Sequence, residues 1–418
     1  MTDHPPDDEI PFDPLDPRFI ADPYPAYDRV RAWSGAWRRD GDPLWYLTRH
    51  ADVHAAFRDR RLGVTFTHRH TPEALGLPPG IPVWRDPRWQ EFAAFERWEL
   101  LNVEPPVHTR LRRLVTEAFT PRTIEGLRGG IVERARALLA PGREAGSIDL
   151  VDDYAQPFSL GIICDLIGVA AEDRLRIRHW SDEVVAMYEP APCEAQRAAS
   201  DSAAGEFRRY LLDVVAERRR RPAGDLLSAL LDATVDGERL TDDQVVSTAM
   251  VLLMAGHEAT VNATANGIAL LAADPDQWRR LRAGEVGART AIEEILRFDP
   301  PLQWFGRWVL EPGVVIDGIE IPVGSRVALV LAAANRDPRR WPEPARFEIA
   351  RGDTGHLSFG GGIHFCIGAP LARLELETTL TELIRSEAAI ELDGPPVRRR
   401  TFQFRGFEHL RIRVRPSA

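Results

Sequence analysis

The sequence predicts a mainly α-helical fold with small β-sheets, organised as a single large domain. Helical patterns follow one another from residue 107 to about residue 226, and a longer helix extends from a Thr-Asp-Asp cap at residue 241 to about residue 272. Short strand-like stretches with Asp-Gly and Val-Gly turns occupy residues 306–332 and indicate only a minor sheet. No internal repeat divides the chain.

The N-terminal third combines short elements with one long irregular segment. Residues 1–16 begin with an acidic, proline-rich stretch and are expected to be a flexible segment, so that the domain spans residues 17–418. Loops as long as the Pro-, Arg- and Trp-rich segment from about residue 60 to residue 104 are usually lids or binding loops. The other elements predicted here are a helix at 23–33, a strand at 44–48 and a helix at 50–57.

Prolines and cations set the boundaries of the later helices. Breaks are expected at Thr120-Pro121, Pro141-Gly142 and Pro222. The run Arg218 to Arg221 complements the dipole at the end of a helix and does not indicate a nucleic-acid site. The remaining predictions are a helix at 288–298 ended by Asp-Pro-Pro, a last helix at about 369–385, and a small strand region at the C-terminus.

Composition excludes several classes of protein. The 418 residues carry a net charge of −10, which argues against a nucleic-acid-binding protein. No apolar stretch approaches the ~20 residues needed to span a bilayer, and the N-terminus shows neither a signal peptide nor an anchor, so a cytoplasmic protein without membrane attachment is expected. With three cysteines, Cys164, Cys193 and Cys366, neither a disulfide framework nor a clustered zinc or iron–sulfur site is expected.

Cys366 lies in the most informative part of the chain, Phe-Gly-Gly-Gly-Ile-His-Phe-Cys-Ile-Gly at 359–368. Glycines let the backbone fold tightly around a sulfur and direct amides at it, which favours the thiolate. A helix pattern with Pro370 in its first turn follows at once, so the partial positive charge of a helix N-terminus also favours an anion at Cys366. A thiolate is the form of cysteine that binds metal.

The whole string resembles the heme-binding loop of the cytochrome P450 family. The resemblance implies a cytochrome P450 fold with a buried heme b, iron protoporphyrin IX, and Cys366 as the axial thiolate and metal ligand. Such a thiolate pushes electron density to the iron and favours O–O cleavage. The matching positions are Phe359, Gly360, Gly362, His364, Cys366, Gly368, Leu371, Ala372 and Arg373.

Two further segments resemble parts of the family that surround the heme. His108 and Arg112 are spaced i, i+4 on one helical face, and by resemblance they bind a heme propionate together with Arg307 and His364. Glu294 and Arg297 resemble the Glu-x-x-Arg pair, which joins a downstream arginine that maps onto Arg351. These last three residues are expected to brace the heme loop and to take no part in catalysis.

The middle of the long helix, Ala255-Gly256-His257-Glu258-Ala259-Thr260, resembles the oxygen-activation segment of the family. The resemblance implies that Ala255 and Gly256 make room for dioxygen and that Glu258 is the acid of proton delivery. The position of the usual threonine holds Ala259, and Thr260 is rotated by about 100° around the helix. Ordered water, a substrate hydroxyl, local unwinding or poorly coupled turnover are open alternatives; His257 is given no catalytic role.

Apolar and aromatic residues suggest the substrate pocket. Val251, Met254, Ala255 and Ala259 share a helix face that the resemblance makes a distal wall rather than plain core. Arg85, Arg88 and Arg405 could pair with a substrate carboxylate or be solvated surface. Aromatic candidates for a lid or a pocket wall, half of them expected to be mere packing, are Trp84, Trp89, Phe92, Phe95, Trp98, Trp304, Phe305, Phe402 and Phe404.

The chain is therefore expected to be a monomeric bacterial monooxygenase of secondary metabolism. It would hydroxylate or similarly oxidise a hydrophobic small molecule, such as a terpenoid, another natural product or an aromatic acid, with O₂ and electrons from a separate ferredoxin and its NAD(P)H-dependent reductase. Arg110 and Arg113 are candidate docking positions for that acidic partner. The alternatives are a ligand-sensing heme-thiolate protein without turnover, and a P450 that performs oxidative coupling or peroxide-driven oxidation.

Overall fold

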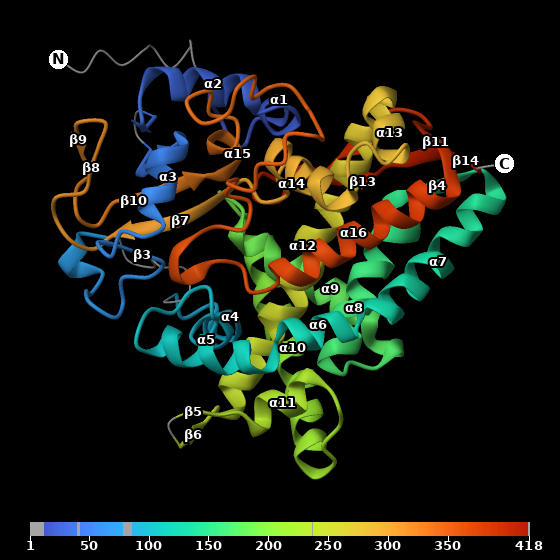
Figure 1. Cartoon of the computed structure of the whole chain (residues 1–418). Helices are drawn as coiled ribbons and strands as arrows, with labels where there is room; N and C mark the ends of the chain where they lie inside the picture. Colours follow the sequence, from blue (N-terminus) through green and yellow to red (C-terminus); the bar gives the residue numbers. More distant parts are fainter. Residues whose placement is uncertain (1–11, 40–41, 78–85, 236, 417–418) are drawn as a thin grey trace.

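The computed structural model describes residues 12–39, 42–77, 86–235 and 237–416, with a small sheet at one end and a larger helical part at the other (Figure 1). Residues 1–11 of the segment expected to be flexible lie outside this description. Phe12, from the same segment, is 2% exposed and packs against Phe19 and Tyr46. Ordered structure therefore begins before residue 17, which corrects the expected boundary.

The sheet at the first end brings together strands from both halves of the chain. Its strand order is β1, β2, β10, β7, β3, with β10 parallel to β2 and antiparallel to β7. Val327 on β10 lies opposite Arg307 on β7, which fixes the position of one of the predicted heme-binding residues. The bounds are β1 (Ala36–Trp37), β2 (Leu44–Leu47), β3 (Leu62–Gly63), β7 (Trp304–Val309) and β10 (Arg326–Val330), with α1 (Pro17–Ala21), α2 (Tyr24–Trp33), α3 (His50–Ala56) and α15 (Leu331–Ala334) nearby.

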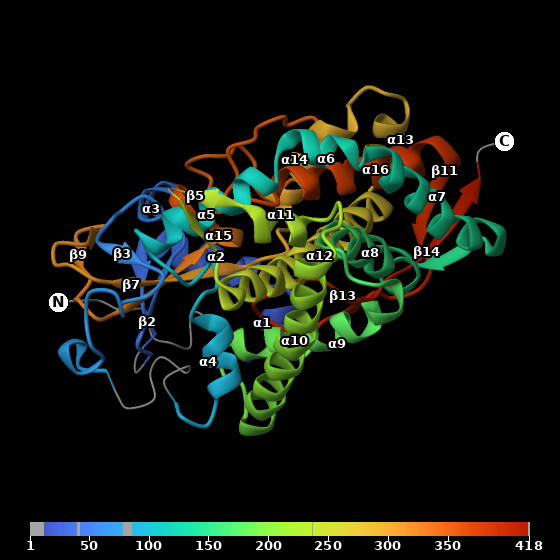
Figure 2. The ribbon, with the colours of Figure 1, turned by 90° about the horizontal axis from the view of Figure 1, so that it is seen from below.

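The helix α12 (Asp242–Ala273) runs through the middle of the helical part (Figures 1 and 2). It begins at the predicted cap, where the Thr241 hydroxyl accepts a bond from the Gln244 amide at 3.3 Å, and it packs against helices on several sides. Its neighbours are α4 (Gln90–Glu96), α8 (Gln156–Ile167), α9 (Arg174–Val185), α10 (Glu194–Arg220), α11 (Leu226–Asp232), α13 (Pro275–Arg282), α14 (Ala288–Phe298) and α16 (Ala369–Ser386).

Two predictions about secondary structure need correction. Residues 60–104 are not wholly irregular, because α4 forms within them and buries Phe92 and Phe95. Pro141 does not break its helix, since α7 (Arg128–Ala145) continues through it. The physical reason is tertiary: a side chain at Gly142 would lie 2.7 Å from Ile148, so the missing Cβ lets this turn pack closely against β4 (Ser147–Asp149).

The rest of the chain adds short helices, small hairpins and a three-stranded sheet. Within the described ranges no helix is long and apolar enough to cross a membrane. The helices are α5 (Val107–Ala118), α6 (Pro121–Gly126), η2 (Glu73–Leu75), η4 (Leu150–Ala155), η5 (Ala171–Asp173), η6 (Ala186–Tyr188) and η7 (Gly362–His364). The strands are β5 (Thr234–Val235), β6 (Glu238–Arg239), β8 (Val315–Ile316), β9 (Ile319–Glu320), β11 (Glu387–Leu392), β12 (Val397–Arg398), β13 (Phe407–His409) and β14 (Arg411–Pro416).

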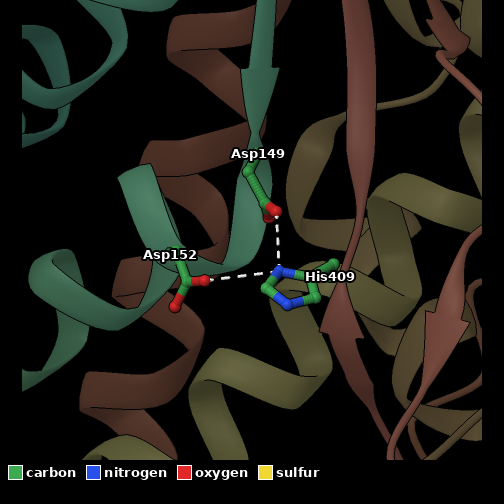
Figure 3. A group of neighbouring side chains, drawn as sticks. All are labelled: Asp149, Asp152 and His409. Carbon is green, nitrogen blue, oxygen red and sulfur yellow. Dashed lines mark hydrogen bonds and ion pairs between the residues drawn. The ribbon is translucent and has the colours of Figure 1, made fainter.

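A polar group joins β13 to the end of β4 (Figure 3). His409 donates from Nδ1 to Asp149 at 3.0 Å and lies 3.3 Å from Asp152. Asp149 also accepts from the Val151 amide as a helix cap, and Arg178 contacts Asp152 at 3.3 Å. These bonds give each carboxylate a protein partner, so the group is explained as a structural link between chain segments.

A second polar group joins the two ends of the described chain. Asp299 accepts from the Tyr24 hydroxyl at 2.6 Å and from Arg405 Nε at 2.8 Å. The terminal nitrogens of Arg405 donate to the carbonyls of Ile20 and Ala21. Although burial alone would raise it, the pKa of Asp299 falls to about 2 because of the neighbouring guanidinium groups. Arg405 is thus buried and structural, which corrects the suggestion that it lies on the surface or meets a substrate.

Candidate active site

The loop that carries Cys366 is held against the end of α3. The Cys366 amide donates to the Phe359 carbonyl at 2.9 Å, which closes the loop on itself. Gly362 adopts a φ of 64°, and a Cβ there would lie 2.1 Å from the Phe57 carbonyl oxygen. Glycine is therefore required at this position both for its conformation and for the close approach of the backbone.

The sulfur of Cys366 has the polar surroundings that the sequence predicted, and the residue is half-buried. Burial raises the pKa of its thiol. The Gly368 and Ala369 amides, at the start of α16, and the Arg112 guanidinium act in the opposite direction, but they do not outweigh burial. Burial thus opposes a thiolate, whereas the amides and Arg112 favour it. A coordinated metal ion removes the proton of a cysteine ligand outright, and the amides then stabilise the resulting anion.

Four basic side chains from three parts of the chain converge beside this loop: His108, Arg112, Arg307 and His364. The rings of His108 and His364 lie 4.3 Å apart, centroid to centroid. In the part of the chain that the structure describes, Nε2 of His108 and both ring nitrogens of His364 are buried without a hydrogen-bond partner. Buried polar atoms are normally paired, so these atoms indicate a place for hydrogen-bonding groups of a ligand.

The four basic residues His108, Arg112, Arg307 and His364 form a cradle whose electrostatics favour an anion. Burial lowers the pKa of Arg307 to about 10 and that of His108 to about 4. Burial and then the charge of Arg307 lower the pKa of His364 to about 2. Glu104 is the acidic neighbour, 4.0 Å from His364 Nε2, but its Oε1 accepts from the Val64 amide. Carboxylates placed among these donors would accept hydrogen bonds from them and so offset the cost of burying them. The cradle therefore fits the propionates of a heme.

A charge network supports the loop from behind. Glu294 forms ion pairs with Arg297 at 2.7 Å and with Arg351 at 3.2 Å. The structure therefore brings together the three residues named from the sequence. Arg297 donates to the Asn335 carbonyl at 2.9 Å, and the Asn335 side chain donates to the Ser358 hydroxyl at 2.9 Å. The network thus reaches the residue before Phe359, where the cysteine loop begins.

A second acid supports the loop and was missed from the sequence. Glu293 accepts from Arg373 at 2.6 Å and from His356 at 3.0 Å, and Arg373 lies 4.4 Å above the Phe359 ring. Burial would raise the pKa of Glu293, yet the bonds from Arg373 and His356 lower it to about 2. The sequence did contain a signal for Glu293, namely its position next to Glu294. Consecutive residues of a helix point about 100° apart, so two adjacent acids can bind different partners.

The helix α12 has small, accessible residues where it faces the site. It is buried along most of its length, yet Ala255 is exposed and Gly256 and Ala259 are partly exposed. Val251 and Met254 from the predicted distal wall are buried. Small, accessible residues within a buried helix leave space beside it for a ligand.

Gly256 has a packing role in addition to the one expected from the sequence. A Cβ at this position would lie 2.7 Å from Ile163 on α8, so glycine permits the close approach of the two helices. The helix is continuous from Asp242 to Ala273. Local unwinding, one of the routes by which Thr260 could reach the oxygen site, is therefore not observed, and Thr260 itself is buried.

Glu258 is held by two residues that the sequence did not single out. Its carboxylate pairs with Arg399, which follows β12, and accepts from Asn262 Nδ2 at 3.1 Å. Both Glu258 and Asn262 are buried. His257 points elsewhere and donates from Nδ1 to the Leu253 carbonyl at 2.7 Å. Glu258 therefore has a fixed orientation, supplied from the C-terminal part of the chain.

A further buried acid lies behind α12. Glu375 on α16 is fully buried, and burial raises its pKa to about 8. Its polar neighbour is Ser159 on α8, whose hydroxyl donates to the Gly256 carbonyl at 3.4 Å. The sequence did contain a signal, because Glu375 is four residues after Leu371 and so lies on the apolar face of that helix.

Comparisons with known proteins agree with this site. The chain is 38% identical over 385 residues to the cytochrome P450 monooxygenase PikC of Streptomyces venezuelae, covering 90% of this chain and 87% of that protein. The chain is a cytochrome P450. The family model described as "Cytochrome P450" matches residues 181–286 and 288–387. The family uses a heme whose iron is bound by a cysteine thiolate.

Other relatives agree with this P450 assignment and are bacterial. The 6-deoxyerythronolide B hydroxylase of Saccharopolyspora erythraea is 38% identical, with 90% of this chain and 91% of that protein covered. The crystal structure of P450BioI with an acyl carrier protein ligated to hexadec-9Z-enoic acid has a TM-score of 0.87 and 31% identity, covering 95% of this chain and 99% of that chain. The mainly helical fold predicted from the sequence is confirmed.

The aromatic residues expected to line the P450 pocket divide into two groups. Trp84 and Arg85 lie outside the described residues. Trp304 and Phe402 stack at 6.3 Å and belong to a buried cluster around Phe12 and Phe19, whereas Phe305 and Phe404 are only half-buried. Of the lid candidates, Trp89, Phe92 and Phe95 are in the main core and Trp98 is half-buried. Several of these positions therefore contribute packing.

Arginines expected to meet partners are largely engaged within this P450. Arg110 pairs with Glu238 of the β5–β6 hairpin at 2.5 Å. Arg88 pairs with Asp86 at 2.6 Å and with Glu194 at 2.7 Å. The Arg88 side chain is exposed and that of Arg110 is half-buried, so both ion pairs reach solvent and can be exchanged for those of a binding partner.

Proposed function

We propose that this P450 monooxygenase inserts one oxygen atom of O₂ into a C–H bond of a hydrophobic natural product. Electrons would come from a separate ferredoxin and its NAD(P)H-dependent reductase. The observation that carries the proposal is the cradle of His108, Arg112, Arg307 and His364 beside Cys366, because its unpartnered nitrogens and buried guanidinium match an anionic heme. In this proposal Cys366 binds the iron and the four basic residues bind the propionates.

The bound heme supplies the binding and activation of dioxygen. The residues of α12 shape the space above it, with Ala255 and Ala259 leaving room for substrate and oxygen. Val251 and Met254 provide apolar surface, which favours a hydrophobic substrate and excludes water. Phe305 and Phe404 are two aromatic residues with accessible surface that can contact the substrate.

Proton supply in this proposal depends on Glu258. Its neighbours Arg399 and Asp182 connect it to the outside, since the Asp182 side chain on α9 is 43% exposed and its pKa is raised by burial and by the charge of Glu258. With alanine at 259, no side-chain hydroxyl stands at the position next to Glu258 on the helix. Ordered water or a hydroxyl of the substrate then completes the connection.

The names of relatives support a large hydrophobic substrate without selecting one. One relative is a 6-deoxyerythronolide B hydroxylase, and another, 38% identical over 90% of this chain, is a vitamin D(3) 25-hydroxylase of Pseudonocardia autotrophica. A polyketide lactone and a steroid-like compound differ in shape but share a large apolar surface. Arg110 and Arg113 on α5 are the proposed docking residues for ferredoxin, with Glu238 displaced from Arg110 by a carboxylate of the partner.

The heme assignment is tested by the absorption spectrum of the ferrous–CO complex. The red-shifted band typical of a thiolate ligand is expected for the wild type and is lost in Cys366→His. Cys193→Ser, at an exposed cysteine, is the control and retains it. An imidazole-like spectrum in the wild type would contradict the proposal. A titration of the ferric protein against polyketide, steroid and terpenoid panels, read by the low-to-high-spin shift, then selects the substrate class.

A further inference from the structure

A short segment between α9 and α10 borders the space above α12. It consists of η6 and Glu189, and both flanking helices pack against α12. The helix α4 contacts α10 and α12 as well, so α4, α9 and α10 all pack against the central helix. Glu189 lies near the middle of α12, because the charge of Glu258 adds to burial in raising the pKa of Glu189.

Tyr188, the last residue of η6, is tied to α4. Its hydroxyl donates to Glu96 and lies 3.1 Å from Glu99. Asn102 donates to the same two carboxyl groups, at 2.7 Å from Glu96. Glu96 and Glu99 are each 3% exposed, and these contacts contain no cation.

Glu189, the next residue, is tied to the opposite side. Its two carboxylate oxygens accept from the amides of Phe402 at 3.0 Å and of Gln403 at 3.3 Å. Those amides belong to the turn before β13, which also carries Phe404, one of the proposed substrate contacts. Burial raises the pKa of Glu189, and the two amide bonds lower it.

We propose that Tyr188 and Glu189 form a clasp that closes the substrate pocket, one residue fastening α4 and the other fastening the turn at 402–403. The inference rests on the proposed function, because it places substrate in the space beside α12. Because Tyr188 and Glu189 are consecutive, they connect the segment between α9 and α10 to α4 and to the turn at 402–403 at the same time. Opening the pocket therefore requires both polar contacts to separate together.

The chemistry of the clasp suits repeated opening. Apolar residues at both positions would hold the walls together through the hydrophobic effect, which is lost in full on exposure to water. Carboxylates and a phenol regain hydration when they separate, so the net contribution of such a contact is small. Segments that move in function are drawn from contacts of this kind.

The pair Glu96–Glu99 makes the clasp dependent on pH. The closed form holds a proton between the two carboxyl groups, since burial and mutual repulsion raise the pKa of Glu96 far above its usual value and burial raises that of Glu99 to about 7. In an open, hydrated form both groups would titrate near about pH 4.3. The closed form binds more protons between these limits, so it loses stability as the pH rises from about 4.3 to 7 and beyond.

The groups that face this pair come from each neighbouring element. Tyr188 approaches from η6 and Asn102 from the loop after α4. Burial raises the pKa of both carboxyl groups, whereas the hydrogen bonds from Tyr188 and Asn102 lower it. Charged side chains on the adjoining helices have other partners: Arg209 of α10 approaches Glu91 of α4, and Arg88 contacts Glu194. Among the described residues, no ion pair reaches Glu96 or Glu99, so loss of the shared proton to solvent is not offset by a cationic partner there.

Stopped-flow binding of pyridine to the ferric holoenzyme tests the clasp, because pyridine has to enter the pocket to bind iron. Tyr188→Phe and Glu189→Gln are each expected to increase the association and dissociation rates by about fivefold, the factor given by one hydrogen bond of ordinary strength. The dissociation constant stays nearly constant, since a gate alters both rates equally. Tyr210→Phe is the matched control: its hydroxyl bonds Asp173 at 3.0 Å, away from η6.

The pH dependence and an independent probe complete the test. Wild-type rates should rise between about pH 6 and about pH 8, whereas Glu99→Gln should remove most of this rise because the amide cannot titrate. Hydrogen exchange of residues 186–192 should speed up in Tyr188→Phe and Glu189→Gln and should lose its dependence on pH in Glu99→Gln. Rates and exchange that equal those of the wild type in all three variants overturn the clasp. Absence of any pyridine spectrum, with exchange still altered, instead contradicts the proposed heme function.

Discussion

Arg399 and Glu258 are 141 residues apart in the chain and form an ion pair inside the site. The pair connects the C-terminal turn region with the middle of α12, and Asn262 adds a bond to the same carboxylate. It gives the proposed proton-delivering acid a fixed direction. In the proposed function, with the aligned hydroxyl absent at Ala259, this fixed carboxylate would order water near the oxygen site.

Replacement of Arg399 should uncouple turnover. In Arg399→Gln the Glu258 carboxylate loses its ionic partner, and we expect the ratio of product to peroxide to fall by about tenfold. The buried charge left behind should lower the free energy of unfolding by about 3 kcal/mol. Arg399→Lys should recover part of both effects. Arg400→Gln, at the exposed neighbouring residue, is the control, and an equal effect there would contradict a specific role for Arg399.

Restoring the missing hydroxyl should have the opposite effect. In Ala259→Thr the hydroxyl stands next to Glu258 at the position that the family uses, so the ratio of product to peroxide should change, and we expect it to rise. Thr260→Ala should leave the ratio unchanged, since Thr260 faces another direction on a continuous helix. Oxygen uptake, peroxide and product are measured together. An unchanged ratio in Ala259→Thr would show that position 259 is outside the relay.

The basic residues of α5 should separate into two functions. Arg112→Gln should reduce heme retention by about tenfold, because a charged hydrogen-bond donor to a propionate is lost. Arg110→Gln should retain heme and raise the KM for ferredoxin. The two arginines are half a turn apart on one helix and carry the same charge, so each variant is the control for the other. Equal heme loss in both would show a general destabilisation of α5.

Glu375 should leave a signature in the pH dependence of stability. Its folded pKa of about 8 lies above the usual glutamate value, so the folded state binds the extra proton and loses stability as the pH rises from about 4.3 to 8. In Glu375→Gln this loss is absent, and the variant should gain a few kcal/mol relative to the wild type across that range. Urea unfolding of the holoenzyme at both ends of the range measures it. Glu377→Gln, a less buried position on α16, should show no such trend.

The sequence was informative wherever the signal is local. The cap at Thr241 and the Asp-Pro-Pro stop after Phe298 set the ends of α12 and α14 through bonds within a few residues. The loop around Cys366 was equally readable, because glycines with positive φ and amides directed at sulfur are properties of that short stretch.

Residues that act through distant partners could not be predicted. No pattern in the sequence pairs Arg399 with Glu258 or Glu189 with the 402–403 turn, since those contacts exist only after the chain has folded. Trp304 and Phe402 have the residue types of a pocket, yet they pack with Phe12 in a core cluster. Pro141 is the opposite case, in which a local signal was present but misleading. A proline normally ends a helix, yet α7 continues through Pro141 because tertiary packing compensates.

The bonds from Arg405 to the carbonyls of Ile20 and Ala21 have a consequence for biosynthesis. The ribosome releases the N-terminal helices first, but the guanidinium that donates to them is synthesised 385 residues after Ile20. Until then α1 and α2, and the aromatic residues that pack on them, lack a stable docking surface. Chaperone dependence of a nascent chain arrested before residue 405 should therefore exceed that of the released protein, because folding here waits for contacts between the two ends.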